Sequence, residues 1–258
     1  MQGLRTALSK DATKEVLELF RKENFTGPFT TLDVHRVCRI GEFISDEVVF
    51  RFSRHFASKH FTSEWKKLYV ESPAFISSIL DVEKMNIQFK VLAYFMKQVD
   101  DNKLPTWGQR LTQGQRLLLP ISVPLNVHWL LVVMWKEDKM INIEVVDSMH
   151  WENQIMQLHE RLVEKIVKII RLMGGVGNTP ITAVESVPLQ QHKMYHFCGF
   201  HVLARIFMES TNQTKNVLTS PDIEKVRKYV QYMILSKETM EHKVFEYVDS
   251  EEDEFTLE

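Results

Sequence analysis

The part of the chain between residues 117 and 146 limits most strongly what the protein can fold into, because three short apolar runs follow one another there. The runs are Leu117–Ile121, Trp129–Trp135 and Ile141–Val146. The charged segment Lys136-Glu137-Asp138-Lys139 separates the last two runs and predicts a hairpin turn. Each run is far shorter than the roughly 18 residues of a membrane span. The runs therefore predict neighbouring strands of a buried sheet.

Helical periodicity surrounds this strand cluster on both sides. The spacing of apolar residues predicts helices over 12–24, 45–60, 73–98, 153–173 and 199–208, and a last helix opening at Ser220-Pro221-Asp222. Gly174 is expected to end the helix at 153–173, and Ile181–Val187 predicts a fourth strand. The pattern therefore predicts one α+β domain with a helical N-terminal part, a central strand cluster and packed helices.

Composition excludes several classes of protein. The chain has 258 residues, is 44% hydrophobic and contains only 9 Gly and 8 Pro, which argues against disorder and collagen-like repeats. The 32 basic and 34 acidic residues give a net charge of -2, so we expect neither a general nucleic-acid surface nor a polybasic membrane anchor.

The two cysteines, Cys38 and Cys198, are too few for a disulfide framework or a four-thiolate zinc site. Met1–Lys10 lacks the apolar region of a secretory signal. We therefore expect an intracellular protein, cytoplasmic or nuclear, with reduced thiols.

Cys198 lies where a strand is expected to give way to the apolar helix that begins at Gly199. The positive end of a helix dipole favours a thiolate, and the free amides there can stabilise an oxyanion. The alternative interpretation is a small buried apolar residue, and we keep that interpretation for Cys38. A nucleophilic thiol needs a base, and the candidate base is His128, which stands directly before the second apolar run. The alternative interpretation of His128 is a histidine with a purely structural role.

Asp147 ends the third apolar run. If the second and third runs form an antiparallel hairpin, His128 and Asp147 lie at the same end of the sheet, so the carboxylate can orient the imidazole. Gln190 and Gln191 precede the cysteine by eight and seven positions, and a neutral amide suits a developing oxyanion. The ends of the predicted elements thus carry one histidine, one aspartate, one glutamine and one cysteine. This combination favours a catalytic site over a chance arrangement of these residues.

These residues resemble a known family. Five segments resemble the ubiquitin-like-protein-specific proteases, which are the sentrin/SUMO-specific cysteine peptidases related to the adenovirus-type protease. The segments are Leu117–Ile121, Asn126-Val127-His128-Trp129-Leu130, Val146-Asp147-Ser148, Pro188–Gln191 and Cys198-Gly199. Two further upstream segments resemble family segments, namely Gly41–Glu47 and Pro105-Thr106-Trp107. The order His, Asp, Gln, Cys is the order of that family, and the resemblance covers about residues 30–210.

The resemblance implies a single papain-like or adenain-like cysteine protease domain with a central mixed β-sheet. It implies cleavage after the Gly-Gly end of a ubiquitin-like modifier, of SUMO type or ubiquitin itself, either from conjugates or from precursors. By analogy Cys198 attacks, His128 moves the proton, Asp147 orients His128 and Gln191 helps form the oxyanion hole. Trp129 would roof a channel for glycine. Phe43 would form the opposite wall, and Asp46 would contact the modifier's basic surface.

The sequence also departs from the family. Phe197 stands where the family has Asp, His192–His196 replaces an Asn-Gly approach, and the spacing between glutamine and cysteine is about one residue longer. These changes are expected to alter the rim beside the nucleophile and hence the identity of the modifier. They also leave open whether Gln190 or Gln191 supplies the donor.

Three alternatives remain open: a viral or mobile-element polyprotein protease of the same fold, an acetyltransferase using the same Cys-His-Asp site, and a non-catalytic modifier-binding module. No cofactor is expected, and His196, Cys198 and His201 lack a fourth ligand for zinc. We expect a monomer consisting of an N-terminal helical extension (1–25), the catalytic domain (26–248) and a disordered acidic tail (249–258).

Overall fold

The structure is a computed structural model that describes residues 31–38, 42–59, 68–123, 128–148, 153–184, 195–211, 218 and 220–235. The helix predicted over 12–24, the acidic tail, and Gln190 and Gln191 lie outside the described residues.

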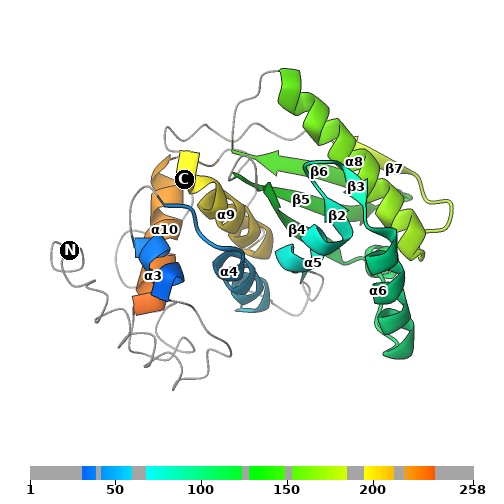
Figure 1. Ribbon diagram of the computed structural model, residues 1–258, viewed down its shortest axis with the longest axis horizontal. Helices are drawn as coiled ribbons and strands as arrows, with labels where there is room; N and C mark the ends of the chain where they lie inside the picture. Colours follow the sequence, from blue (N-terminus) through cyan, green and yellow to red (C-terminus); the bar gives the residue numbers. More distant parts are fainter. Residues whose placement is uncertain are drawn as a thin grey trace.

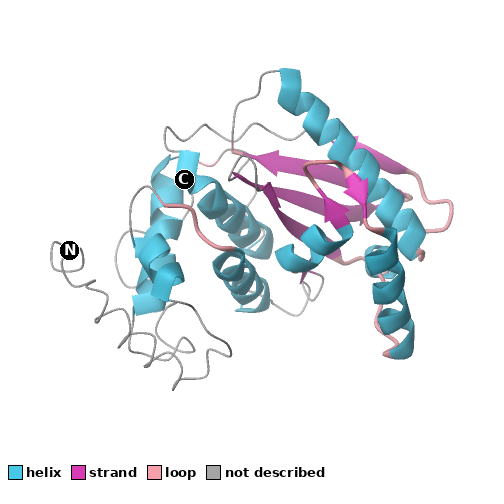
Figure 2. Cartoon of the chain, viewed as in Figure 1, coloured by secondary structure: helices cyan, strands magenta, loops and turns pink. Residues whose placement is uncertain are grey.

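Five of the described strands form one mixed sheet in the order β1-β4-β5-β6-β7. Figure 2 draws the strands of this sheet in magenta. The strands are β1 (Leu68–Val70), β4 (Arg116–Val123), β5 (His128–Glu137), β6 (Met140–Asp147) and β7 (Ile181–Val184). The three central strands pair antiparallel, and the edge strands β1 and β7 run parallel to their neighbours. The predicted hairpin is confirmed, because β5 and β6 pair in register from Leu130↔Asp147 to Glu137↔Met140.

Alternation along the central strands creates a hydrophobic core on each face of the sheet. On one face, odd-numbered residues of β4 and β6 and even-numbered residues of β5 pack beneath helices. The helices in contact there are α5 (Pro73–Ile79), α6 (Phe89–Asp101), α7 (Trp107–Thr112) and α8 (Asn153–Met173). Figure 1 shows α8, the helix predicted over 153–173, lying across this face. Gly174 follows it with φ 75°, as expected for a glycine that ends a helix.

The opposite face carries the element that begins with Cys198. Leu118, Leu131, Val133 and Val146 pack there against α4 (Asp46–Lys59) and α9 (Cys198–Thr211). Beyond α9 lie α10 (Ser220–Leu235) and α3 (Thr31–Cys38), which contact each other (Figure 1). None of the helices in the described ranges is long and apolar enough to cross a bilayer.

Part of the secondary-structure prediction was wrong. The single helical zone expected over 73–98 is divided into α5, the small antiparallel pair β2 (Leu80–Asp81) and β3 (Asn86–Ile87), and α6. Met85 turns this pair with a positive φ of 49°, without the glycine that would have marked the turn. Helix α7 was also missed, although Thr106 and Gln109 form a reciprocal capping box at its start.

Candidate active site

His128 and Asp147 meet at one end of the β5–β6 hairpin. His128 is the first residue of β5 and Asp147 the last of β6, so the antiparallel register brings them to the same sheet end. The His128 Nε2–H donates to Oδ1 of Asp147 across 2.7 Å, since a carboxylate only accepts. Both residues are buried. The hydrogen bond fixes the tautomer of the ring and leaves Nδ1 for another partner.

That partner is Cys198, the first residue of α9, whose side chain hydrogen-bonds with the His128 ring. A 3-10 turn, Tyr195–Phe197, leads directly into the helix and places Cys198 at its N-terminus. The free amides of the first helical turn surround this position. The sulfur, imidazole and carboxylate predicted to converge are therefore joined by two hydrogen bonds in series.

The imidazole is held in its charged form by its two partners. Burial lowers the pKa of His128, but the hydrogen bonds to Asp147 and Cys198, together with their charges, outweigh burial and raise the pKa to about 9. An imidazolium in this place has the Asp147 carboxylate on one side and the Cys198 side chain on the other, which is the order of groups that a thiolate–imidazolium pair requires.

The raised pKa of His128 predicts a pH-dependent stability. Because the folded pKa of about 9 exceeds the ordinary value of 6.5, the stabilisation is complete below 6.5 and is lost as the pH rises towards 9. The free energy of unfolding of the wild type should decline over this window, by at most about 3 kcal/mol. Urea titrations at several pH values would measure the decline. A His128→Gln variant that kept the same slope would show that another group is responsible.

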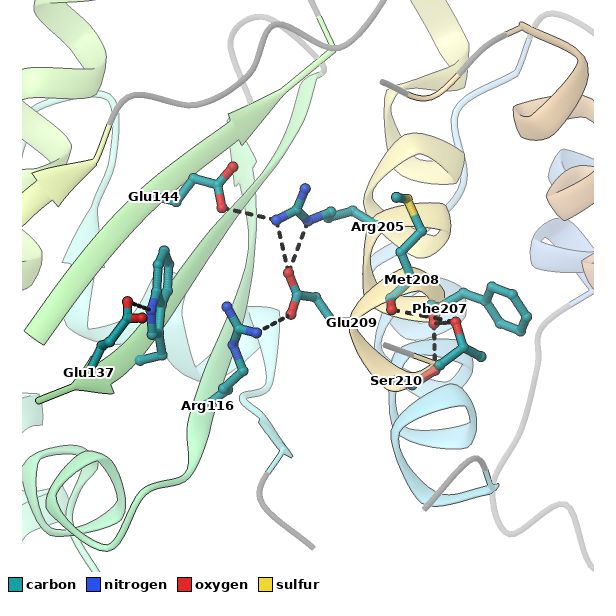
Figure 3. A network of polar contacts seen from close by, with 10 residues as sticks. Arg116, Glu137, Glu144, Arg205, Phe207, Met208, Glu209 and Ser210 are labelled. Atoms are coloured by element: carbon teal, nitrogen blue, oxygen red, sulfur yellow. Dashed lines mark hydrogen bonds and ion pairs between the residues drawn. The ribbon is translucent and has the colours of Figure 1, made fainter. Parts of the chain in front are cut away.

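A polar network fixes the helix that carries Cys198 to the sheet (Figure 3). Arg205 of α9 contacts Glu144 of β6 at 3.0 Å and Glu209 of α9 at 2.8 Å. Glu209 also binds Arg116 of β4 at 3.1 Å, and the Arg116 guanidinium lies over the Trp135 ring at 4.8 Å. The two charged residues of α9 therefore have partners on two strands, and this limits sliding of α9 relative to the hairpin that holds His128 and Asp147.

Three segments come into close contact at the start of α9. A Cβ added to Gly199 would lie 2.5 Å from Cγ1 of Ile44 and 3.3 Å from Cδ1 of Trp129. The indole Nε1–H of Trp129 donates to the backbone oxygen of Ile44 across 3.3 Å, and both side chains are buried. Only glycine fits at position 199 without displacing its neighbours.

Replacement of Gly199 by alanine is therefore expected to lower the free energy of unfolding by about 1 to 2 kcal/mol, because overpacking outweighs the gain in helix propensity. Chemical denaturation followed by tryptophan fluorescence would measure the change. Gly199→Ala should cost less in an Ile44→Ala background than in the wild type, since alanine at position 44 lacks both the Cγ1 and the Cδ1 atoms next to the new methyl group. An equal cost in the two backgrounds would contradict the packing argument.

The remaining predicted substrate-binding residues lie around this contact. Phe43 precedes Ile44, is partly buried, and meets the His196 ring edge to face at 6.5 Å. Asp46 is exposed in the first turn of α4. Phe197 does not lie on the rim as expected. It is 2% exposed and packs in the core against Phe200, so the aromatic residue that replaces the family's Asp serves packing.

The sequence interpretation missed one neighbour of Asp147. His159 of α8 donates from Nε2 to Oδ2 of Asp147 across 3.1 Å, so both carboxylate oxygens accept from an imidazole. A signal was present, because His159 lies four residues after Ile155 and three before Leu162, on the apolar stripe that faces the sheet. A polar residue in an apolar stripe indicates a buried polar partner.

Within the described ranges, no group of three or more His, Cys, Asp or Glu side chains is arranged to hold a metal ion. Cys38 and Cys198 are both free thiols.

Several solved structures with the same fold are SUMO proteases. The C-terminal Ulp1 protease domain in complex with Smt3, the yeast ortholog of SUMO, aligns with a TM-score of 0.57 at 14% identity over 90% of this chain and 96% of that chain. A SUMO protease Ulp1 whose catalytic cysteine is oxidised to a sulfinic acid aligns with a TM-score of 0.56 at 14% identity, over 88% of this chain and 93% of that chain. The catalytic domain of the Ulp1-like SUMO protease of Chaetomium thermophilum aligns with a TM-score of 0.52 at 13% identity, over 89% of each chain. At such identities the likeness shows a shared fold.

Family membership rests on the sequence match. No curated protein matches the chain. The model of the Ulp1 protease family, C-terminal catalytic domain, matches residues 51–239, which contain His128, Asp147 and Cys198. This match covers most of the chain and agrees with the resemblance seen in its motifs. The chain belongs to the Ulp1 family and is a cysteine peptidase with a mixed α+β catalytic fold.

Proposed function

We propose that the protein cleaves the bond after the C-terminal Gly-Gly of a ubiquitin-like modifier of SUMO type or of ubiquitin, from conjugates, from precursors or from both. The observation that carries the proposal is the chain of contacts from Asp147 through His128 to Cys198. A related fold binds Smt3 in a solved complex, which supports a modifier as the partner.

In the proposed first step, the thiolate of Cys198 attacks the carbonyl carbon of the terminal glycine while His128 carries the proton. The carbonyl oxygen gains negative charge, which the free amides at the start of α9 stabilise in the proposal. The bond to the leaving nitrogen then breaks as the His128 imidazolium gives its proton to the departing amine. The products of this step are the free amine and a thioester between the modifier and Cys198.

The second step releases the modifier. Neutral His128 accepts a proton from water, and the resulting hydroxide attacks the thioester carbonyl, so that the carboxylic acid of the modifier leaves and the sulfur is regenerated. Asp147 stays ionised and stabilises the imidazolium that forms in both steps.

The packing beside Cys198 supports selection of glycine. Trp129, Ile44 and Gly199 are in contact where the substrate would pass the helix N-terminus. In the proposal, a narrow passage beside these contacts would reject any residue with a side chain through steric clash. Phe43, next to Ile44, extends this wall in the proposal, and exposed Asp46 is available to a basic modifier surface.

The proposal is tested with matched substrates. SUMO and ubiquitin are each prepared in two forms, as a precursor that extends beyond its Gly-Gly and as an isopeptide conjugate. Both forms are incubated with the purified chain and with its Cys198→Ala variant. Release after Gly-Gly from a modifier by the wild type alone supports the proposal. Cleavage of short Gly-containing peptides without preference for an attached modifier would favour polyprotein processing. Acetyl transfer from coenzyme A to a target, without any hydrolysis, would favour an acyltransferase.

Gln191 remains the predicted side-chain donor to the oxyanion, with Gln190 as the alternative. Loss of one oxyanion donor typically lowers kcat by about 100- to 1,000-fold. We therefore expect this loss for Gln191→Ala and a change below about threefold for Gln190→Ala, measured as kcat on the preferred precursor. Reversed effects would assign the role to Gln190, and two unaffected variants would leave the backbone amides of α9 as the oxyanion donors.

A further inference from the structure

We propose that His159 is a positioning residue for this site, which holds the Asp147 carboxylate in the plane needed to orient His128. The inference rests on the proposed function, because it concerns the same thiol and imidazole. His159 does not reach the sulfur in this account; it acts through the carboxylate.

The geometry around Asp147 carries the proposal. Oδ1 accepts from Nε2 of His128 at 2.7 Å, and Oδ2 accepts from Nε2 of His159 at 3.1 Å. The Asp147 side chain is 2% exposed, and the His159 side chain is 20% exposed. The carboxylate is thus bound on one side by a strand residue and on the other by a helix residue, and His159 lies on its more solvent-accessible side.

A carboxylate bound at one oxygen can still rotate about its Cβ–Cγ bond. A second hydrogen bond at the other oxygen fixes the plane of the group, and a buried network is rigid only when its members are satisfied. Removal of the second donor would take the His159 hydrogen bond from Oδ2 and allow the Asp147 carboxylate a wider range of orientations. The orientation of the His128 ring would then be less well defined.

His159 is itself held rigidly. It lies on α8, where Leu162, Ile166 and Ile169 further along the same stripe are fully buried against the sheet. A donor mounted on a packed helix keeps its place more accurately than one on a loop. Helix α8 thereby supports the carboxylate that β6 contributes.

The test compares three variants. His159→Leu removes the donor, His159→Gln keeps an N–H donor, and Glu160→Gln, at an exposed neighbouring position, is the control. Active sites are counted with an electrophilic modifier probe, so that kcat refers to competent molecules only. We expect kcat of His159→Leu to fall about 10- to 100-fold with little change in KM, as when a transition-state interaction is weakened. The glutamine variant should recover most of this loss, and the control should stay within about twofold.

A second readout needs no substrate. The ring N–H proton of His128 that is bonded to Asp147 should give a downfield proton NMR resonance, identified by its absence in His128→Gln. This resonance should shift or broaden in His159→Leu and remain in Glu160→Gln. If the wild type cleaves no modifier, the proposed function fails while this readout still tests the positioning role. Unchanged kcat per active site with an unchanged resonance in His159→Leu, even with lower thermal stability, would overturn the proposal.

Discussion

Replacement of Cys198 by alanine is expected to abolish hydrolysis of modifier precursors, with a fall in kcat of about a million-fold, the typical cost of removing a nucleophile. The reason is the thioester step, which has no substitute once the sulfur is gone. Initial rates of cleavage of a precursor that extends beyond its Gly-Gly would measure the effect. The variant should still fold, because alanine is small, apolar and suited to the 2% exposed position at the start of α9.

Cys38→Ala is the matched control. Cys38 lies in α3, which packs against α10, and burial raises the pKa of its thiol to about 11 despite the charge of Arg227. A protonated thiol is a poor nucleophile, so activity should stay within about twofold of the wild type. Activity lost with Cys38 and retained without Cys198 would refute the assignment.

Asp147→Asn should lower kcat by about 10,000-fold while leaving the fold intact, as expected when the residue that sets the histidine tautomer is replaced by an amide. The amide either donates to the ring or accepts more weakly from it, so Nδ1 of His128 no longer faces the thiol in the required form. Steady-state kinetics with circular dichroism as a folding check would measure the change.

The pH profile separates this effect from simple damage. In the wild type the alkaline limb of kcat/KM should fall near pH 9, where the raised pKa of His128 predicts loss of the imidazolium. In Asp147→Asn the limb should move to lower pH, because burial continues to lower the pKa of His128 while the carboxylate no longer raises it. An alkaline limb that stays near pH 9 in the variant would contradict the role given to Asp147.

Much of the sheet could be predicted, because its strands have distinct local signals. The three apolar runs, the charged turn after Trp135 and the helix over 153–173 each match an observed element. The division of 73–98 could not be predicted from spacing, because Ile79, Leu80 and Ile87 continue the apolar pattern across a turn that lacks Gly and Pro. The three-residue strand β1 is too short to carry a periodic signal.

The sequence predicted the candidate site best where two residues lie on one hairpin. His128 and Asp147 followed from antiparallel pairing alone, and Cys198 from its place before an apolar helix. The place of His159 in the apolar stripe signals a buried polar partner, but the identity of that partner depends on how α8 crosses the sheet, which local sequence does not determine. The burial of Phe197 likewise results from packing between α9 and its neighbours, and it was wrongly expected at the rim.

The most direct test of the account is to locate the covalent adduct formed with a modifier whose C-terminal glycine carries an electrophile. SUMO and ubiquitin probes are reacted with the whole chain, and the products are digested and mapped by mass spectrometry. The account predicts a single adduct on the sulfur of Cys198, formed much more slowly in His128→Gln. An adduct on Cys38, or equal labelling with and without the imidazole of His128, would contradict it.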